Sequence, residues 1–115
     1  RLRTRFRKVE ELEVDVAVKQ AEGFAGMHIQ FAGRYFYLYA CGGGIYPPYE
    51  TANAVLKRTT MRIRLRRVEN RYEMFVDGEL VCEAAGKPAR EFREDEVTLW
   101  STHGASIQYD NLKVK

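Results

Sequence analysis

The stretch that decides the fold is Arg62–Val81, which reads RIRLRRVENRYEMFVDGELV. Apolar and charged side chains alternate along it, as they do in β-strands that bury one face and leave the other in water. Glu69-Asn70 and Asp77-Gly78 interrupt the alternation, and the second dipeptide is typical of a type I′ turn. We therefore predict three antiparallel strands joined by two tight hairpin turns.

These two turns also predict a register. On the apolar face the expected neighbours are Leu65 and Met74, Ile63 and Val76, and Val81 beside Met74. On the other face the expected pairs are Arg66 with Glu73 and Arg62 with Asp77. Opposite charges that face each other across antiparallel strands stabilise a sheet by roughly 0.2–1 kcal/mol. The apolar face and the charged face therefore agree on one register.

Another hairpin is predicted in Met27–Ala40, which reads MHIQFAGRYFYLYA. Gly33-Arg34 suits a two-residue type II′ turn, because glycine takes the positive φ of the first position. The expected apolar pairs are Phe31 with Phe36 and Ile29 with Leu38. On the opposite face the expected pairs are Gln30 with Tyr37 and His28 with Tyr39.

Alternation of period two recurs along the rest of the chain, and no segment keeps a helical apolar pattern for long. The predicted strands are Leu2–Val9, Glu11–Lys19, Gly26–Phe31, Tyr35–Cys41, Thr60–Val68, Arg71–Asp77, Glu79–Ala84, Glu96–Ser101 and Ser106–Val114. The first two could be one strand with an irregularity at Val9–Glu10. Two stretches rich in Gly and Pro or in charge, 41–57 and 86–95, are predicted as loops.

Strands with one apolar and one polar face pack as two antiparallel sheets around a shared core. We therefore predict an all-β, two-sheet antiparallel sandwich, formed by residues 1–115 as a single domain. The predicted core residues are Leu12, Val14, Val16, Val18, Met27, Ile29, Phe31, Phe36, Leu38, Ile63, Leu65, Met74, Val76, Val81, Val97, Leu99, Ile107, Leu112 and Val114.

Composition limits the classes of function that the chain can have. The 115-residue chain carries a net charge of +3, which is too small to indicate a polyanion-binding protein by itself. No apolar run is long enough to span a bilayer, so no membrane span is predicted. Cys41 and Cys82 match no metal-ligand spacing, and we predict free thiols rather than a disulfide. The arginines of residues 62–66 could imitate a nucleic-acid platform, but the nearby carboxylates argue against that interpretation.

Three pieces of sequence resemble the second half of a concanavalin A-like jelly roll: the hairpin with Asp77-Gly78 at its tip, the pair Leu99-Trp100, and the closing YDNLKV of Tyr109–Val114. Glu11–Phe31 is similar to the strand and hairpin that precede them. The resemblance extends to laminin-G-like domains and to sugar-directed jelly rolls such as the 3-keto-disaccharide hydrolase type. It implies a carbohydrate-directed function and an extracellular or periplasmic location, although this fold carries many unrelated functions.

The chain departs from this family pattern at its beginning. Such domains usually run longer and begin with a further strand or two. Either Arg1–Val9 is the family's first strand, or that strand is missing and a sheet edge is left open. An open edge could pair with another copy of the chain or with another part of the parent protein.

Glu11, Glu13 and Asp15 line the polar face of one predicted strand. Laminarinase-type glycoside hydrolases of this fold carry a similar triplet, with the acids at the second and third places exchanged. A retaining glycosidase needs two carboxyl groups about 5 Å apart, whereas i and i+2 side chains of a strand emerge about 6.5–7 Å apart. The alternative is an ion-pair ladder with the arginines of residues 62–66. We favour the ladder over ligand contact and over catalysis.

Aromatic and polar side chains are predicted together on a sheet face that points away from the core: His28, Gln30, Tyr35, Tyr37, Tyr39 and Trp100. Aromatic rings with a polar edge stack on the apolar faces of sugars and bond to their hydroxyls. The alternative is that the tyrosines favour strands and merely cover one another. We predict that Tyr37, Tyr39 and Trp100 lie on one concave sheet.

His103 lies in the predicted loop STHGAS and is a further candidate for ligand contact. Two isolated histidines without partners at ligand spacing do not predict a metal site, and no phosphate-binding motif is present. We therefore expect neither a metal nor a cofactor. By analogy with laminin-G-like domains Asp110-Asn111 could bind calcium, but a turn or bulge in the last strand is favoured.

Three classes of function stay open. The favoured one is a lectin-like, carbohydrate-binding accessory module without catalytic activity, in which the aromatic face contacts sugar. The alternatives are a hydrolase of glycosidic bonds that uses the acidic strand, and a structural domain that pairs through an open sheet edge. Carbohydrate is the predicted partner, and nucleic acid is disfavoured.

Overall fold

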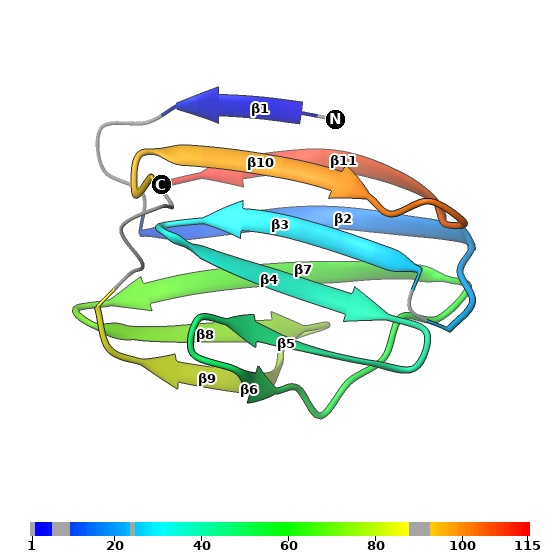
Figure 1. The fold of residues 1–115 in the computed structure, drawn as a ribbon. Helices are drawn as coiled ribbons and strands as arrows, with labels where there is room; N and C mark the ends of the chain where they lie inside the picture. Colours follow the sequence, from blue (N-terminus) through cyan, green and yellow to red (C-terminus); the bar gives the residue numbers. More distant parts are fainter. Residues whose placement is uncertain (1, 6–9, 24, 88–92) are drawn as a thin grey trace.

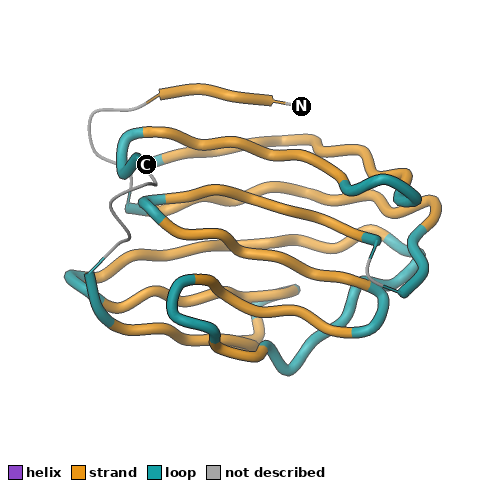
Figure 2. Tube along the Cα trace, viewed as in Figure 1, coloured by secondary structure: helices purple, strands orange, loops and turns teal. Residues whose placement is uncertain are grey.

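The computed structural model of the chain describes residues 2–5, 10–23, 25–87 and 93–115. Within these ranges the chain forms eleven strands and no helix, arranged as two antiparallel sheets that pack face to face (Figure 1). Short loops and turns connect the strands (Figure 2). The predicted all-β, two-sheet sandwich is confirmed.

The strand order of each sheet shows how the chain winds between the layers. The first sheet has six strands in the order β1 (Leu2–Arg5), β10 (Glu96–Ser101), β3 (Gly26–Phe31), β4 (Arg34–Tyr39), β5 (Gly42–Tyr46) and β6 (Glu50–Thr51). The second has five, in the order β11 (Ser106–Val114), β2 (Glu11–Gln20), β7 (Thr60–Val68), β8 (Arg71–Val76) and β9 (Glu79–Ala85). The N-terminal stretch therefore supplies an edge strand, β1, beside β10.

Two strands were not expected. β5 and β6 lie inside residues 41–57, which the sequence analysis predicted as a loop because of its glycines and prolines. That prediction was wrong, because β5 pairs along its whole length with β4. The predicted strand Leu2–Val9 is seen over Leu2–Arg5, whereas residues 6–9, with the proposed irregularity at Val9–Glu10, and residues 88–92 of the second loop lie outside the described residues.

The core lies between the sheets, as the alternation predicted. Every predicted core residue from Leu12 to Leu99 is buried, and each such side chain stabilises the fold by roughly 1.5–3 kcal/mol relative to full exposure. Ile107, Leu112 and Val114 are only partly buried, because their strand β11 forms an edge. Buried residues that the sequence analysis did not predict include Ala32, Ile45, Ala52, Leu56, Met61, Tyr72, Cys82 and Ala84.

The β3–β4 hairpin differs from its predicted register. The turn lies at Ala32-Gly33, whose φ values of 50° and 85° suit a type I′ turn, and not at Gly33-Arg34. The observed apolar pairs are Ile29 with Phe36 and Met27 with Leu38, and the outer pairs are Gln30 with Tyr35 and His28 with Tyr37. The shift of two residues keeps every side chain on its predicted face, because side chains alternate with period two.

The shifted turn buries Arg34, and contacts of its guanidinium group make that burial tolerable. It now faces Phe31 and is fully buried, a place that sequence reasoning would not give to a charged residue. Its guanidinium carbon lies 4.2 Å from the centre of the Tyr72 ring, and its Nη2 donates a hydrogen bond to the carbonyl oxygen of Gly86. A cation over an aromatic face recovers part of the cost of leaving water.

The hairpins of Arg62–Val81 follow the prediction more closely. Ile63 faces Val76, Leu65 faces Met74 and Arg66 faces Glu73. The amide of Asp77 donates to the carbonyl of Arg62, and the Asp77 carboxylate accepts from the Arg62 amide, both at 2.8 Å. In the β8–β9 pair, however, a bulge places Cys82 opposite Met74. The prediction that Val81 lies beside Met74 was wrong, because the bulge sets two residues against one.

The two sheets also meet at their lateral edge, where β6 and β9 approach each other. The amide of Asn53 donates to the carbonyl of Val81 at 2.8 Å. Close by, the Cys82 thiol donates to the carbonyl of Glu50 at 3.4 Å. These bonds hold β6, and therefore its neighbour β5, against the five-stranded sheet.

Candidate functional site

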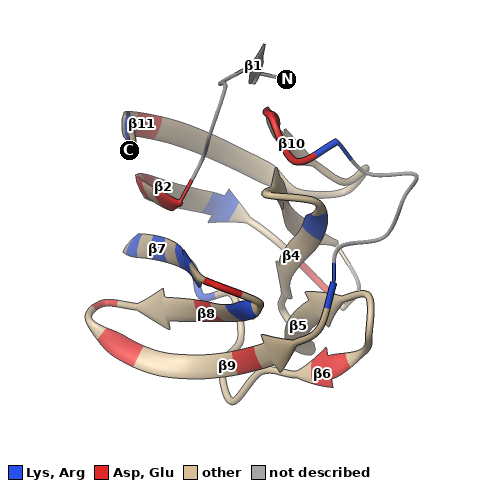
Figure 3. Cartoon of the chain, turned by 90° about the vertical axis from the view of Figure 1, so that its left-hand side faces the viewer, with Lys and Arg blue, Asp and Glu red and all other residues tan. Residues whose placement is uncertain are grey.

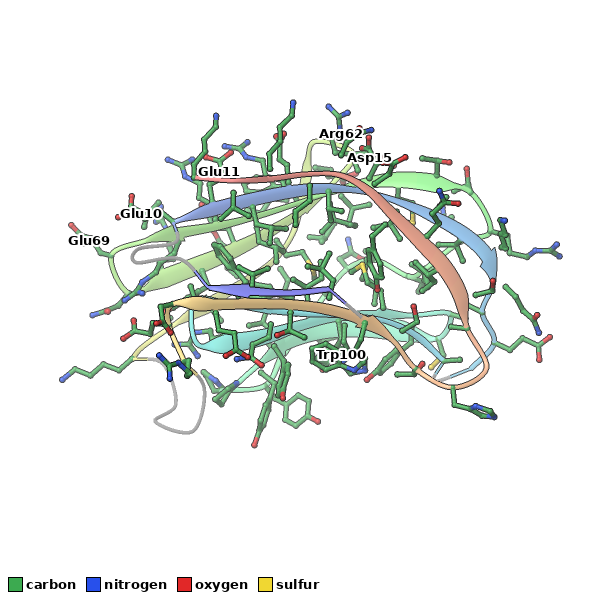
Figure 4. All side chains as sticks on the ribbon, turned by 90° about the horizontal axis from the view of Figure 1, so that it is seen from above. Glu10, Glu11, Asp15, Arg62, Glu69 and Trp100 are labelled. Atoms are coloured by element: carbon green, nitrogen blue, oxygen red, sulfur yellow. The ribbon has the colours of Figure 1, made fainter. Side chains whose placement is uncertain are left out.

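A row of residues crosses the outer face of the six-stranded sheet at right angles to the strands. Successive register pairs run from Trp100 to His28, from His28 to Tyr37, from Tyr37 to Gly44 and from Gly44 to Thr51. Cross-strand neighbours project from the same face of a sheet. Figure 4 shows Trp100 outside this sheet, on the opposite side of the sandwich from Glu11 and Asp15.

This face contains a pocket of about 520 Å³, within the size range of small-ligand sites. Five residues predicted as ligand contacts line it: His28, Tyr35, Tyr37, Tyr39 and Trp100. The sequence analysis did not predict its other lining residues as ligand contacts, and these are Tyr46, Tyr49, Cys41, Gly42, Gly43 and Thr51. The expectation that Tyr37, Tyr39 and Trp100 share one sheet agrees with β4 and β10 lying in the same sheet.

The pocket is hollow because β5 is almost bare on this face. Gly42 and Gly44 stand opposite Tyr39 and Tyr37, where other residues would project a side chain. A Cβ at Gly44 would overlap the carbonyl oxygen of Glu50 and lie 2.8 Å from the hydroxyl of Tyr37. The Tyr37 ring therefore reaches across to β5 over a position that only glycine can occupy.

The rings from β3, β4 and β10 form one wall of the pocket, the first wall, and pack against one another. They are His28, Tyr35, Tyr37, Tyr39 and Trp100. His28 stacks on Trp100 with centroids 5.1 Å apart and planes 9° apart, and Tyr35 meets Trp100 edge to face at 5.4 Å. Tyr37 and Tyr39 lie 5.1 Å apart, and a 3.0 Å hydrogen bond joins the Tyr39 hydroxyl to Nε2 of His28. Aromatic pairs in such geometries attract each other beyond their area burial, so the wall is held in place before any ligand arrives.

The second wall comes from the last residue of β5, Tyr46, and from Tyr49 in the turn before β6. Tyr46 and Tyr49 lie 4.9 Å apart, and Tyr49 meets the edge of Tyr37 at 6.4 Å. Tyr49 is 74% exposed, an unusual place for a large ring. One signal in the sequence could have found this wall. Gly42, Gly44 and Tyr46 are spaced by two residues, as residues on one face of a strand are, but the glycines indicated a loop.

Burial keeps the titratable rings of the pocket uncharged near neutral pH. It lowers the pKa of His28 below the ordinary value of 6.5, which favours the neutral imidazole. It raises the pKa of Tyr37 and of Tyr39 above the ordinary value of 10.0, and the neighbouring Tyr49 adds to both shifts. The pocket therefore offers ring faces and hydroxyl groups to a ligand.

Gln30 and His103 are placed differently from the other candidates. Gln30 projects from the same sheet face, between Thr98 and Tyr35, and is half-buried. His103 is exposed in the turn between β10 and β11. Neither is among the described residues that line the pocket.

The acidic triplet lies on the outer face of the other sheet. Glu11, Glu13 and Asp15 stand opposite Arg66, Arg64 and Arg62 in register. Asp15 pairs with Arg62 at 3.0 Å, and Glu11 pairs diagonally with Arg64 at 2.9 Å. Hydrogen bonds from Arg62 and Asn111 lower the pKa of Asp15, whereas a general acid needs a raised one. The favoured ion-pair ladder matches this geometry.

The remaining metal and thiol candidates can be placed within the described part of the chain. Cys41 and Cys82 are free, as predicted, and burial raises the pKa of Cys82 to about 11. No group of three His, Cys, Asp or Glu residues suited to a metal ion occurs in these ranges. Asn111 has a φ of 54° beside a bulge, as predicted, and its side chain donates to Asp15 at 2.8 Å. No described helix could cross a membrane.

Known proteins resemble this chain in fold and not in sequence. No protein-family model matches the sequence, and no curated protein matches it. The sandwich has the jelly-roll fold. Among solved structures it is similar to sheep galectin-11 in complex with glycerol, with a TM-score of 0.69 and 10% sequence identity, over 99% of this chain and 95% of that one. The resemblance to 3-keto-disaccharide hydrolases stays a prediction.

Proposed function

We propose that the chain is a carbohydrate-binding module without catalytic activity, which holds a sugar in the aromatic pocket of its six-stranded sheet. The observation that carries this proposal is the pocket itself, which aromatic rings line beside Gly42 and Gly43 of β5. Ring faces stack on the C–H faces of a sugar, and phenol hydroxyls bond to its hydroxyl groups. The hydroxyl of Thr51 adds a further polar group to the lining.

The structural neighbour supports the same proposal. Sheep galectin-11 is a galectin, and its structure was solved with glycerol, a small polyol. This chain shares its fold across nearly the full length of both proteins. Because a fold alone does not define a function, the proposal depends on the pocket and takes only secondary support from this likeness.

The position of the acidic strand favours binding over hydrolysis. Glu11 and Asp15 are engaged by arginines on the outer face of the five-stranded sheet, with the core between them and the pocket. A sugar held beside Tyr37 therefore lies on the opposite outer face of the β-sandwich from these carboxylates.

The test is a glycan array followed by calorimetric titration of the best ligand. Tyr49→Ala should weaken binding roughly two- to tenfold, since one aromatic contact contributes about 0.5–1.5 kcal/mol. Tyr49 is exposed, so its removal should leave the fold intact. Phe75→Ala, on the outer face of the other sheet beside Arg64, is the matched control and should bind normally. An intact domain that binds no glycan at millimolar sugar would refute the proposal.

A further inference from the structure

We propose that the pocket selects its sugar by charge, so that it accepts an uncharged sugar unit and excludes one that carries a carboxylate or a sulfate. This inference rests on the proposed sugar binding and adds to it the chemical class of the ligand. It concerns four tyrosines that line the pocket: Tyr37 and Tyr39 on β4, Tyr46 at the end of β5, and Tyr49 in the turn that follows.

The chemistry of the lining is the first argument. Every described residue that lines the pocket is an aromatic ring, a glycine, a threonine or a cysteine. The face of an aromatic ring carries negative electrostatic potential, so it attracts C–H groups and repels an anion. A carboxylate that leaves water for this pocket would lose its hydration and meet ring faces in exchange.

The state of the titratable groups is the second argument. Burial favours the neutral form of the His28 imidazole by lowering its pKa, so this ring supplies no cation at neutral pH. The hydroxyls of Tyr37 and Tyr39 stay protonated because burial raises the pKa of both. A neutral sugar hydroxyl can pair with such groups, since each phenol both donates and accepts.

The distribution of charge over the molecule is the third argument. Bands of Lys, Arg, Asp and Glu cross β2, β7 and β9, whereas β5 carries no charged residue (Figure 3). Arg62 and Arg64 are held by Asp15 and Glu11 on the far side of the core. These two guanidinium groups therefore lie across the core from the pocket.

The experiment uses three forms of one ligand. The best neutral oligosaccharide of the array is titrated beside its derivative oxidised to a carboxylate at C6, and beside the methyl ester of that derivative. The carboxylate should bind at least about tenfold more weakly than the parent, because its charge is desolvated without a partner. The ester should bind within about threefold of the parent, since it restores neutrality at nearly the same size.

A variant of the chain provides the reciprocal test. Thr51 lines the pocket and is exposed, so Thr51→Arg adds a guanidinium to the wall at little risk to the fold. It should reduce the preference for the neutral ligand or reverse it. Thr60→Arg, at an exposed position on β7 of the other sheet, is the matched control and should keep the original preference.

Two outcomes separate the inference from the proposal beneath it. If the carboxylate binds as tightly as the parent and the ester, charge selection is wrong while sugar binding stands. If none of the three ligands binds and the array is also negative, the proposed function fails, and this inference fails with it.

Discussion

His28 holds the aromatic wall together at the scale of single residues. Its imidazole stacks on Trp100, lies 6.2 Å from Tyr37, and meets the Tyr39 hydroxyl in a hydrogen bond. Gly26, which stands opposite Tyr39, has no side chain that could separate these rings. A small change in the protonation of this one ring therefore acts on the whole wall.

Acidification should destabilise the fold through His28. The folded-state pKa lies below 6.5, so as the pH falls through 6.5 the unfolded chain takes up this proton first and is stabilised. The stability contribution is present above pH 6.5 and is lost as the pH falls toward the folded pKa. We expect the free energy of unfolding to fall more steeply in wild type than in His28→Gln between about pH 7.5 and about pH 5.5.

Urea unfolding at several pH values measures this difference. The matched control is His103→Gln in the exposed turn between β10 and β11, which removes a histidine outside the ring cluster. Identical pH slopes for wild type and His28→Gln would show that the ring cluster does not disfavour the imidazolium.

Among the strands, β5 has the largest effect on the shape of the pocket. Its glycines let the Tyr37 ring and the backbone of β6 approach on one face, and they let Leu38 approach Gly43 on the other. A strand of ordinary composition would fill this space with its own side chains. The sequence pattern that resembled a loop is therefore what makes the sheet hollow.

Gly44→Ala should disrupt both the pairing of β5 with β6 and the position of Tyr37. The added methyl group overlaps the Glu50 carbonyl and lies 2.8 Å from the Tyr37 hydroxyl, and such overpacking typically costs about 1–3 kcal/mol. We expect a lower free energy of unfolding together with weaker sugar binding. Urea unfolding and calorimetric titration measure the two effects. Unchanged values for both would mean that the close approach at Gly44 has no energetic importance.

Edge strands decide whether the sandwich can pair with a partner. β11 is one edge of the five-stranded sheet, and its ladder with β2 is irregular between Asp110 and Lys113, where Asn111 has positive φ. Bulges of this kind twist an edge and hinder the addition of another strand. Pairing through an open edge therefore stays a prediction, and light scattering in solution is its measurement.

The whole molecule has two outer faces of different chemistry with one core between them. The five-stranded sheet presents the ladder of Glu11, Glu13 and Asp15 against arginines, and the six-stranded sheet presents the pocket. Because the faces have no described lining residue in common, they should respond independently to substitution.

Neutralising the acidic strand tests this independence. The triple variant Glu11→Gln, Glu13→Gln and Asp15→Asn removes the counter-charges that β2 supplies to the arginine stripe and leaves only those of Glu73 and Asp77. The arginines on β7 then repel one another more strongly, so the denaturation midpoint should fall modestly. Sugar affinity should stay within about twofold of wild type, because the pocket lies across the core. Added salt should restore part of the lost stability by screening the arginines. A triple variant that folds but no longer binds sugar would contradict the separation of the two faces.

The sequence predicted in detail which side chains of each strand face the core and which point away from it. Leu65 faces Met74, Ile63 faces Val76, and Tyr37 and Trp100 point away from the core, all as expected. The β3–β4 register could not be predicted, because two adjacent two-residue turns were compatible with the same alternation. The burial of Arg34 could not be predicted either, because it depends on the Tyr72 ring and the Gly86 carbonyl, which are distant from Arg34 in the sequence.

The sequence by itself determined which side chain of each strand faces inward, because that depends only on the local period of two. Tertiary structure alone decided which strands lie side by side. The neighbouring strands make Gly42 part of the pocket lining and make Gly44 the position over which the Tyr37 ring reaches β5. A glycine in isolation indicates a turn. Between Tyr37 on β4 and Glu50 on β6 it forms a strand, since only a position without a Cβ lets the ring and the neighbouring backbone approach so closely.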